Sequence, residues 1–224
     1  MNAPRILVIV GTPLPDSLVH ALADSYVTGA REAGAEVRVV DLARDEIPGH
    51  PTERNELRAP RDTNDRPLDL TVAAYVDSLA WAEHVVFVYP QWWGTYPAAL
   101  KAFVDRVFLA NTAFRYRPAR KLWDKLLTGR TARVVMTMDS PSFWNRFVYR
   151  NAAETSLSRA ILGYCGIRTT GITRFAEVRH RSDETRAEWI AQMGKLGEKD
   201  ARRIAPRERN HLSLDDERSL RSAA

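Results

Sequence analysis

Cysteine is almost absent from this sequence, which has one, Cys165, among 224 residues. A single cysteine excludes an intrachain disulfide and leaves too few thiolates for a cysteine-built zinc site. The histidines show no metal-ligand spacing, so we expect no metal site. Cys165 lies in an apolar segment without a partner histidine, which favours a buried packing role over that of a nucleophile.

Long apolar runs are absent as well. No segment approaches the roughly 20 apolar residues that span a bilayer. Residues 1–5 also lack the start of a signal peptide, so we expect a cytoplasmic protein with no membrane insertion. The hydrophobic fraction of 45% is enough for a sizeable core, and the length suits one large domain.

Short β-branched apolar runs alternate along the chain with segments of helical periodicity. This alternation predicts an α/β fold, a doubly wound parallel sheet of five strands in the order 2-1-3-4-5 with helices on both faces. The expected strands are residues 5–10, 36–41, 84–89, 131–138 and 167–175. The expected helices begin near residues 17, 70, 96, 152 and 185.

Two polar segments interrupt this pattern. Residues 43–67 are rich in proline and charge and predict a long, irregular loop. Residues 206–224 carry many charges and few apolar groups. We therefore predict a folded domain over residues 1–205, followed by a charged C-terminal tail that is mobile or docks on a partner.

The predicted topology locates a binding site. In doubly wound sheets, ligands bind beyond the C-terminal ends of the strands, at the point where the strand order reverses. In the order 2-1-3-4-5 the reversal falls between the first and third strands. The loops expected to form the site are residues 11–18, 90–96 and 138–145.

The first loop, GTPLPDSL, connects a buried strand to a helix N-terminus. Free N–H groups and the helix dipole favour an anion there, and Thr12 and Ser17 add hydroxyl donors. The loop matches neither the G-x-G-x-x-G fingerprint nor the lysine-containing P-loop. It is therefore either a phosphate cradle for a mononucleotide or an ordinary capped turn.

The second loop, PQWWGTYP, places Trp92, Trp93 and Tyr96 around Gly94. Aromatic faces of this kind stack against flat ring systems, and backbone N–H groups of residues 92–94 are available for the polar edge of such a ring. The alternative is that the aromatic side chains pack against neighbouring helices.

Residues 89–108, YPQWWGTYPAALKAFVDRVF, resemble the signature of the flavodoxin-like NAD(P)H:quinone oxidoreductases, with its P-x-x-W-x-x-x-P-A-x-L-K core. The first loop and the later segment LGYCGI, residues 162–167, are also similar to that family. The resemblance covers roughly residues 5–197, most of the chain.

The resemblance implies a flavodoxin-like fold and a flavin cofactor, FMN or FAD. It also implies hydride transfer from NAD(P)H to quinone, azo or nitroaromatic acceptors by a ping-pong mechanism. The chain is shorter than the FAD-binding mammalian members, which favours FMN. Members are usually homodimers with the active site at the subunit interface, so the resemblance implies a homodimer. The implied cofactor-binding residues are Thr12, Asp16, Ser17, Leu18, Pro90, Gln91, Trp92, Trp93, Gly94, Thr137, Met138, Asp139 and Ser140.

The loop after the fourth strand departs from the family pattern. Many members have two glycines after a Thr-Thr pair, where this chain has Thr137-Met138-Asp139-Ser140. The Asp139 carboxylate either turns away from the ring, caps another segment, or faces the flavin and disfavours its anionic reduced form. A backbone N–H at Asp139 or Ser140 would instead stabilise that anion. No catalytic residue is assigned, and the candidate pocket walls are Phe143, Trp144 and Tyr149.

The net formal charge is +5, and residues 115–130 are strongly basic with one acid, Asp124. This stretch is either a solvated face or a surface that attracts the phosphates of a nicotinamide dinucleotide. No nucleic-acid motif accompanies it, so we expect no nucleic-acid partner. Two other functions stay open, an ancillary regulatory subunit of a transport system and a one-electron carrier. The positive charge argues against the carrier, because such proteins are usually acidic.

Overall fold

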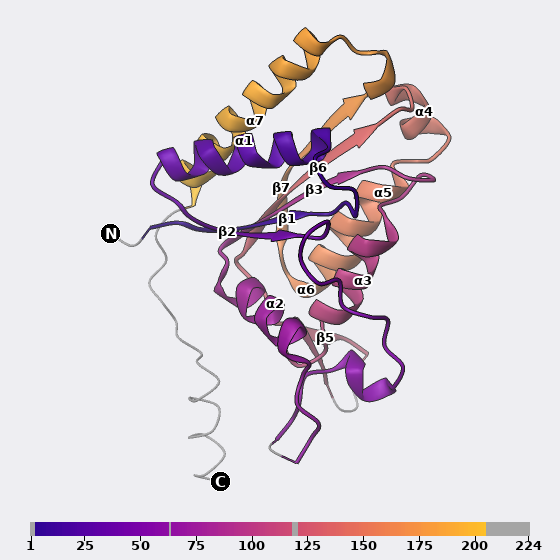
Figure 1. Cartoon of the computed structure of the whole chain (residues 1–224). Coiled ribbons are helices and arrows are strands. Elements are labelled where there is room, and N and C mark those ends of the chain that lie inside the picture. The colour runs from indigo at the N-terminus through magenta and orange to yellow at the C-terminus, as the bar shows by residue number, and fades with distance from the viewer. Residues whose placement is uncertain (1–2, 63, 118–120, 205–224) are drawn as a thin grey trace.

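The computed structural model describes residues 3–62, 64–117 and 121–204. Its centre is a five-stranded parallel sheet in the order β2-β1-β3-β6-β7 (Figure 1). This order confirms the predicted 2-1-3-4-5 topology. The predicted tail, residues 206–224, lies outside the described residues, so the domain boundary at residue 205 stays a prediction. The sheet strands are β1 (Arg5–Val10), β2 (Glu36–Asp41), β3 (His84–Pro90), β6 (Thr131–Met138) and β7 (Arg168–Ala176).

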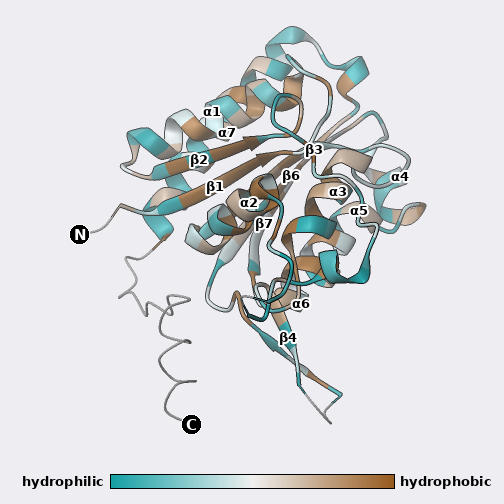
Figure 2. Cartoon of the chain, turned by 60° about the horizontal axis from the view of Figure 1, so that its bottom comes forward, coloured by the Kyte–Doolittle hydropathy of each residue, from teal (hydrophilic) through white to brown (hydrophobic). Residues whose placement is uncertain are grey.

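Helices cover both faces of the sheet (Figures 1 and 2). One face is covered by α1 (Leu18–Glu32) and α7 (Asp183–Arg203). The other is covered by α2 (Leu70–Trp81), α3 (Ala98–Val107) and the continuous helical segment α5 (Ala152–Thr155), η2 (Ser156–Leu162) and α6 (Gly163–Cys165).

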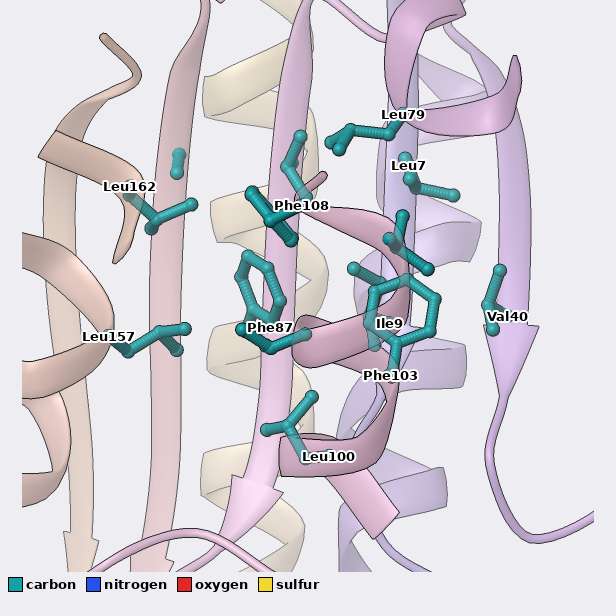
Figure 3. Packing of buried hydrophobic residues seen from close by; sticks show 14 of the residues in the cluster. Leu7, Ile9, Val40, Leu79, Phe87, Leu100, Phe103, Phe108, Leu157 and Leu162 are labelled. Atoms are coloured by element: carbon teal, nitrogen blue, oxygen red, sulfur yellow. The ribbon is translucent and has the colours of Figure 1, made fainter. Parts of the chain in front are cut away.

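The central strands are apolar on both sides because each side faces a helical layer. Side chains of β1 alternate between two hydrophobic cores, with Leu7 and Ile9 in one and Ile6 and Val8 in the other. Figure 3 shows the first core, where Phe87 of β3 packs against helix α3. Burial of both faces explains why these strands read as continuous rather than alternating apolar runs.

Close approach of α1 and α7 depends on glycine. A Cβ atom on Gly29 would lie 2.1 Å from the carbonyl oxygen of Gly194, and one on Gly197 would lie 2.1 Å from that of Tyr26. Backbone atoms occupy that space, so a side chain there would force the helices apart. The spacing of these glycines therefore determines how α7 packs on the sheet.

Several local elements differ from expectation. Helix α3 begins at Ala98, with Pro97 as its N-cap rather than its first helical residue. The expected loop after β6 contains a short helix, α4 (Ser142–Phe147), and the expected helix near residue 152 contains a π-helical stretch, η2. Two short 3-10 helices, η1 (Arg54–Leu57) and η3 (Val178–His180), lie in the connections.

The basic stretch forms a two-stranded antiparallel hairpin, β4 (Phe114–Tyr116) and β5 (Trp123–Lys125), which projects from the sheet domain in Figure 2. Residues 118–120 lie outside the described part of the chain. Arg130 donates to the carbonyl oxygens of Ala80 and Ala82 at 2.7 and 2.9 Å, and Lys125 donates to that of Gly163 at 2.8 Å. Lys125 and Arg130 therefore bind carbonyl oxygens of neighbouring helical segments, while Arg117 and Lys121 are exposed, in agreement with a solvated face.

None of the helices in the described part of the chain is both long enough and apolar enough to cross a membrane.

Candidate functional site

The three predicted loops begin at the C-terminal ends of neighbouring strands, β1, β3 and β6 (Figure 1). Hydrogen bonds connect them directly. The Gly11 N–H donates to the carbonyl oxygen of Val88 at 2.8 Å, and the Gln91 N–H donates to that of Thr137 at 2.7 Å. Residues far apart in the sequence thus form one continuous surface at the reversal point of the strand order, as predicted.

The first loop ends in the N-terminus of α1, with Ser17 as N-cap. The N–H groups of Leu18 and Val19 have no partner among the described residues, and the first turn contains no acidic residue. Thr12 is buried, and its hydroxyl accepts the Leu14 N–H at 3.2 Å. This end of α1 therefore keeps free donors and the positive end of its dipole, which suits a phosphate.

His20 of α1 holds this loop through contacts with Ser17. Its Nδ1 accepts the Ser17 N–H at 3.3 Å and lies 2.9 Å from the Ser17 hydroxyl, while its Nε2 lies 3.2 Å from Asp41. His20 is buried, so it orients Ser17 rather than meeting a ligand.

Asp16, next to Ser17, pairs with Arg44 at 2.5 Å. Arg44 also pairs with Asp41 at 2.6 Å, and Asp41 is the carboxylate that contacts His20. Asp16, Arg44, Asp41 and His20 therefore form one connected group. Burial alone raises the pKa of Asp41, but hydrogen bonds from the Ala43 N–H and from Arg44 lower it overall. The negative charge of Asp16 beside the α1 N-terminus is therefore balanced by Arg44.

The second loop is a two-residue hairpin turn. The N–H of Trp92 donates to the Thr95 carbonyl at 2.8 Å and the N–H of Thr95 donates back at 2.9 Å. Trp93 and Gly94 at the tip have φ values of 51° and 74°, as a type I′ turn requires. Glycine adopts this conformation freely, whereas tryptophan is strained there. The Trp92 N–H is therefore occupied, and the donors left free among the described residues are the N–H groups of Trp93 and Gly94.

Aromatic side chains surround this turn. Trp93 is fully exposed, and Phe143, Trp144 and Phe147 of α4 are also exposed. Tyr149 lies on the inner side of the turn, since a Cβ atom on Gly94 would be 3.4 Å from its ring. Exposed tryptophans and phenylalanines of this number at the end of a sheet mark a ligand or partner surface.

The third loop resolves the position of Asp139. Its carboxylate accepts the backbone N–H of Arg179 at 3.0 Å and lies 3.3 Å from the guanidinium of the same residue. Asp139 thus caps the connection after β7. Thr137 and Met138 are buried at the end of β6, and Ser140 is half-buried.

A depression of about 550 Å³ lies elsewhere, at the start of β7, and includes none of these loops. Its lining residues include Ser158, Arg159, Thr169 and Ile172. That depression is therefore separate from the candidate site formed by the three loops.

Sequence reasoning missed three side chains beneath the loops. Asn145 of α4 and Glu154 of α5 are almost completely buried, and Arg174 of β7 pairs with Glu154 at 2.7 Å. The Asn145 side chain contacts that of Gln91 at 2.7 Å. Charged and amide residues in short helices are usually exposed, so the sequence predicts surface positions for them. No local pattern therefore indicated that these three side chains contact one another.

Cys165 has the packing role expected for it. It is buried in the first core, and burial raises the pKa of its thiol to about 12. A thiol of this kind stays protonated at neutral pH and is a poor nucleophile.

The residues present fit a flavin mononucleotide. The α1 N-terminus offers free N–H donors for a phosphate, and the adjacent hairpin offers aromatic faces and two free N–H groups for a flat ring with a polar edge. These two features lie on neighbouring strands, so one ligand can engage both.

Comparison with known proteins agrees with this reading. The chain is 31% identical over 155 residues to a ribosyldihydronicotinamide dehydrogenase-like protein of Penicillium crustosum, a match covering 60% of this chain and 57% of that relative. It is 26% identical to an FMN-dependent NADH:quinone oxidoreductase of Mycoplasma genitalium, covering 73% of this chain and 80% of the relative. The crystal structure of Smu.1420 from Streptococcus mutans UA159 superposes with a TM-score of 0.71 at 26% identity, covering 87% of this chain and 99% of the other.

The model of the family described as having a flavodoxin-like fold matches residues 4–196. That span includes every strand of the sheet and all three loops of the candidate site. The chain belongs to this flavodoxin-like family.

Proposed function

We propose that this chain is a flavin-dependent NAD(P)H oxidoreductase that holds FMN at the three loops and reduces a quinone, azo or nitroaromatic compound. The observation that carries the proposal is the hairpin at Trp93 and Gly94, with its exposed ring and free N–H groups, beside the free N-terminus of α1. The names of the Penicillium and Mycoplasma relatives support the same reaction class.

Bound FMN would supply the hydride chemistry, accepting two electrons from NAD(P)H and passing them to the acceptor. The protein's part is binding and orientation. The free N–H groups at the α1 N-terminus, beside Ser17, would hold the phosphate, and the N–H groups of Trp93 and Gly94 would hold the polar ring edge. Trp93 and Trp144 would line the pocket beside the flavin. NAD(P)H and the acceptor would bind there alternately, which gives ping-pong kinetics.

The contact between Asp139 and Arg179 affects the charge that a bound flavin would meet. Because its carboxylate is engaged by Arg179, its charge is directed away from the loop surface and is compensated. A reduced flavin bound at these loops would then meet little repulsion from it, despite the absence of the two family glycines.

We also propose that a second copy of the chain completes the site. Several aromatic side chains at the loops are exposed in the single chain, and a ring bound against exposed side chains is not shielded from water. A homodimer would cover the aromatic residues and close the pocket over the flavin.

The first test is the visible absorbance of the purified protein, incubated with FMN or FAD and then mixed with NADPH or NADH without oxygen. Flavin bands that remain after desalting and bleach on addition of the nucleotide are the expected result. Restoration of the bands by a quinone, with parallel double-reciprocal plots, would establish ping-pong turnover. Failure to retain either flavin would overturn the proposal and favour the regulatory subunit, which capture of a stable transport partner would then support.

A further inference from the structure

Resting on the proposed function, we propose that Glu154 is a positioning residue that determines which hydrogen-bonding group Gln91 presents to the flavin ring. It acts through Asn145, so that the side-chain carbonyl of Gln91 is the group left free. The site would then select a ring that carries an N–H donor at its edge.

Three side chains form the connection. Glu154 Oε1 accepts a hydrogen bond from the Asn145 amide nitrogen at 3.0 Å. The same nitrogen donates to Asn151 Oδ1 at 3.2 Å. The Asn145 oxygen in turn accepts from the Gln91 amide nitrogen at 2.7 Å. In Figure 1, α4 lies at the end of the sheet where the three loops begin.

The direction of these hydrogen bonds follows from the chemistry of a carboxylate. A carboxylate paired with an arginine accepts hydrogen bonds and has none to donate, and Arg174 Nε lies 2.7 Å from Glu154 Oε1. Asn145 must therefore turn its NH₂ group toward Glu154 and its oxygen toward Gln91. Gln91 must then direct its own NH₂ group inward, and its oxygen Oε1 has no partner among the described residues.

Burial makes the direction obligatory. Asn145 is 0% and Glu154 is 1% exposed, so water has little access to replace a lost partner. A reversed amide would place an oxygen against the carboxylate and leave donors unsatisfied, which is costly in a buried network.

A purely structural role does not account for Glu154. Its second oxygen, Oε2, is buried without a hydrogen-bond partner, as is the hydroxyl of the neighbouring Tyr89. Apolar residues would fill this space at less cost than a partly satisfied buried ion pair. The network ends at the Gln91 side chain, which is half-buried and precedes the exposed Trp92 and Trp93 in the second loop.

The ligand chemistry follows from the exposed acceptor. In the oxidised isoalloxazine ring the one N–H donor is N3–H, while the carbonyl oxygens and remaining nitrogens accept. An acceptor at Gln91 therefore complements N3–H and no other edge group of that ring. A ring methylated at N3 loses this hydrogen bond.

The test compares FMN with 3-methyl-FMN by fluorescence titration of the flavin-free protein, in four proteins. The wild type should bind FMN about tenfold more tightly than 3-methyl-FMN, the effect of one hydrogen bond between buried groups. Gln91→Leu, which removes the acceptor, and Glu154→Gln, which releases Asn145 from one orientation, should each bring this ratio close to one. Glu198→Gln, on the exposed side of α7, is the matched control and should keep the wild-type ratio.

A second pair of variants tests the orientation of the Asn145 amide with substitutions that keep the size of the side chains. Gln91→Glu places a carboxylate against the Asn145 oxygen, so FMN should bind about tenfold more weakly from the loss of one directed hydrogen bond. Adding Glu154→Gln lets Asn145 turn its NH₂ group toward residue 91, so the double variant should recover most of that loss. A merely structural Glu154 would make the double variant worse than either single one.

The outcomes separate the two proposals. A wild type that binds neither flavin overturns the proposed function, and this inference with it. A wild type that binds FMN and 3-methyl-FMN equally overturns only the inference. A third outcome concerns Glu154 alone. If Gln91→Leu binds FMN and 3-methyl-FMN equally, but Glu154→Gln keeps the tenfold difference and the double variant does not regain FMN affinity, Glu154 does not orient Gln91.

Discussion

The carboxylate of Asp139 accepts the backbone N–H of Arg179 at 3.0 Å, which ties the loop after β6 to the loop after β7. Both residues are exposed, so the contact positions the loop more than it stabilises the fold. Its consequence is electrostatic, because it directs a negative charge away from the surface where the flavin is proposed to lie.

Asp139→Asn should therefore change the reduction potential of bound FMN little, by less than about 30 mV, the equivalent of about 1.4 kcal/mol for two electrons. The asparagine oxygen can still accept the Arg179 N–H, so the loop keeps its conformation. Equilibration with a redox dye under anaerobic conditions measures the potential. A large increase in the potential of the variant would show that the native carboxylate faces the ring.

Trp93→Ala should weaken FMN binding by about tenfold or more, since aromatic stacking contributes about 1 kcal/mol beyond the burial of ring area. The free energy of unfolding of the chain should stay the same, because Trp93 is fully exposed and occupies a strained φ that alanine tolerates no worse. FMN titration and urea unfolding measure the two quantities. Arg202→Ala, far from the loops on α7, is the control and should alter neither; equal, small effects of the two substitutions would contradict the site assignment.

Ser17→Asp should separate phosphate binding from ring binding. Aspartate is as good an N-cap as serine, so α1 should keep its stability. Its negative charge, however, repels a phosphate at the helix N-terminus. FMN affinity should fall by at least tenfold while riboflavin affinity stays unchanged, in parallel calorimetric titrations. A similar loss for riboflavin would indicate that Ser17 lies beside the ring rather than the phosphate.

The buried pair of Arg133 and Asp200 makes stability depend on pH. Burial alone raises the pKa of Asp200, but hydrogen bonds from Arg133, at 2.5 and 2.8 Å, and the proximity of His84, whose Nε2 lies 3.4 Å away, bring it well below the ordinary value. Because the folded pKa lies below the unfolded one of about 3.9, this contribution is complete at neutral pH and is lost as pH falls below about 4.

Asp200→Asn should therefore lower the free energy of unfolding by about 3–5 kcal/mol at pH 7, since it leaves Arg133 buried without its partner. The difference from wild type should narrow as pH falls below about 4. Urea unfolding across this range measures it, with Asp77→Asn on the exposed face of α2 as the control. A difference that does not vary with pH would mean that the Asp200 charge contributes nothing.

The candidate site was predictable only in part. The ends of three buried strands identified the loops at residues 11–18, 90–96 and 138–145, because strand ends and turn residues are local features. The buried group of Asn145, Glu154 and Arg174 was not predictable, since its members come from α4, α5 and β7 and each resembles a surface residue in its own segment.

The sequence by itself determined the alternation of strands and helices, and with it the α/β class and the ends of the strands, because periodicity and β-branched runs act locally. Only the tertiary structure decided which side chains from different segments contact one another. It turned Asp139 toward Arg179, set His20 beneath Ser17, and aligned the amides of Asn145 and Gln91. These contacts depend on distances between residues far apart in the chain, and those distances exist only after the helices have packed on the sheet.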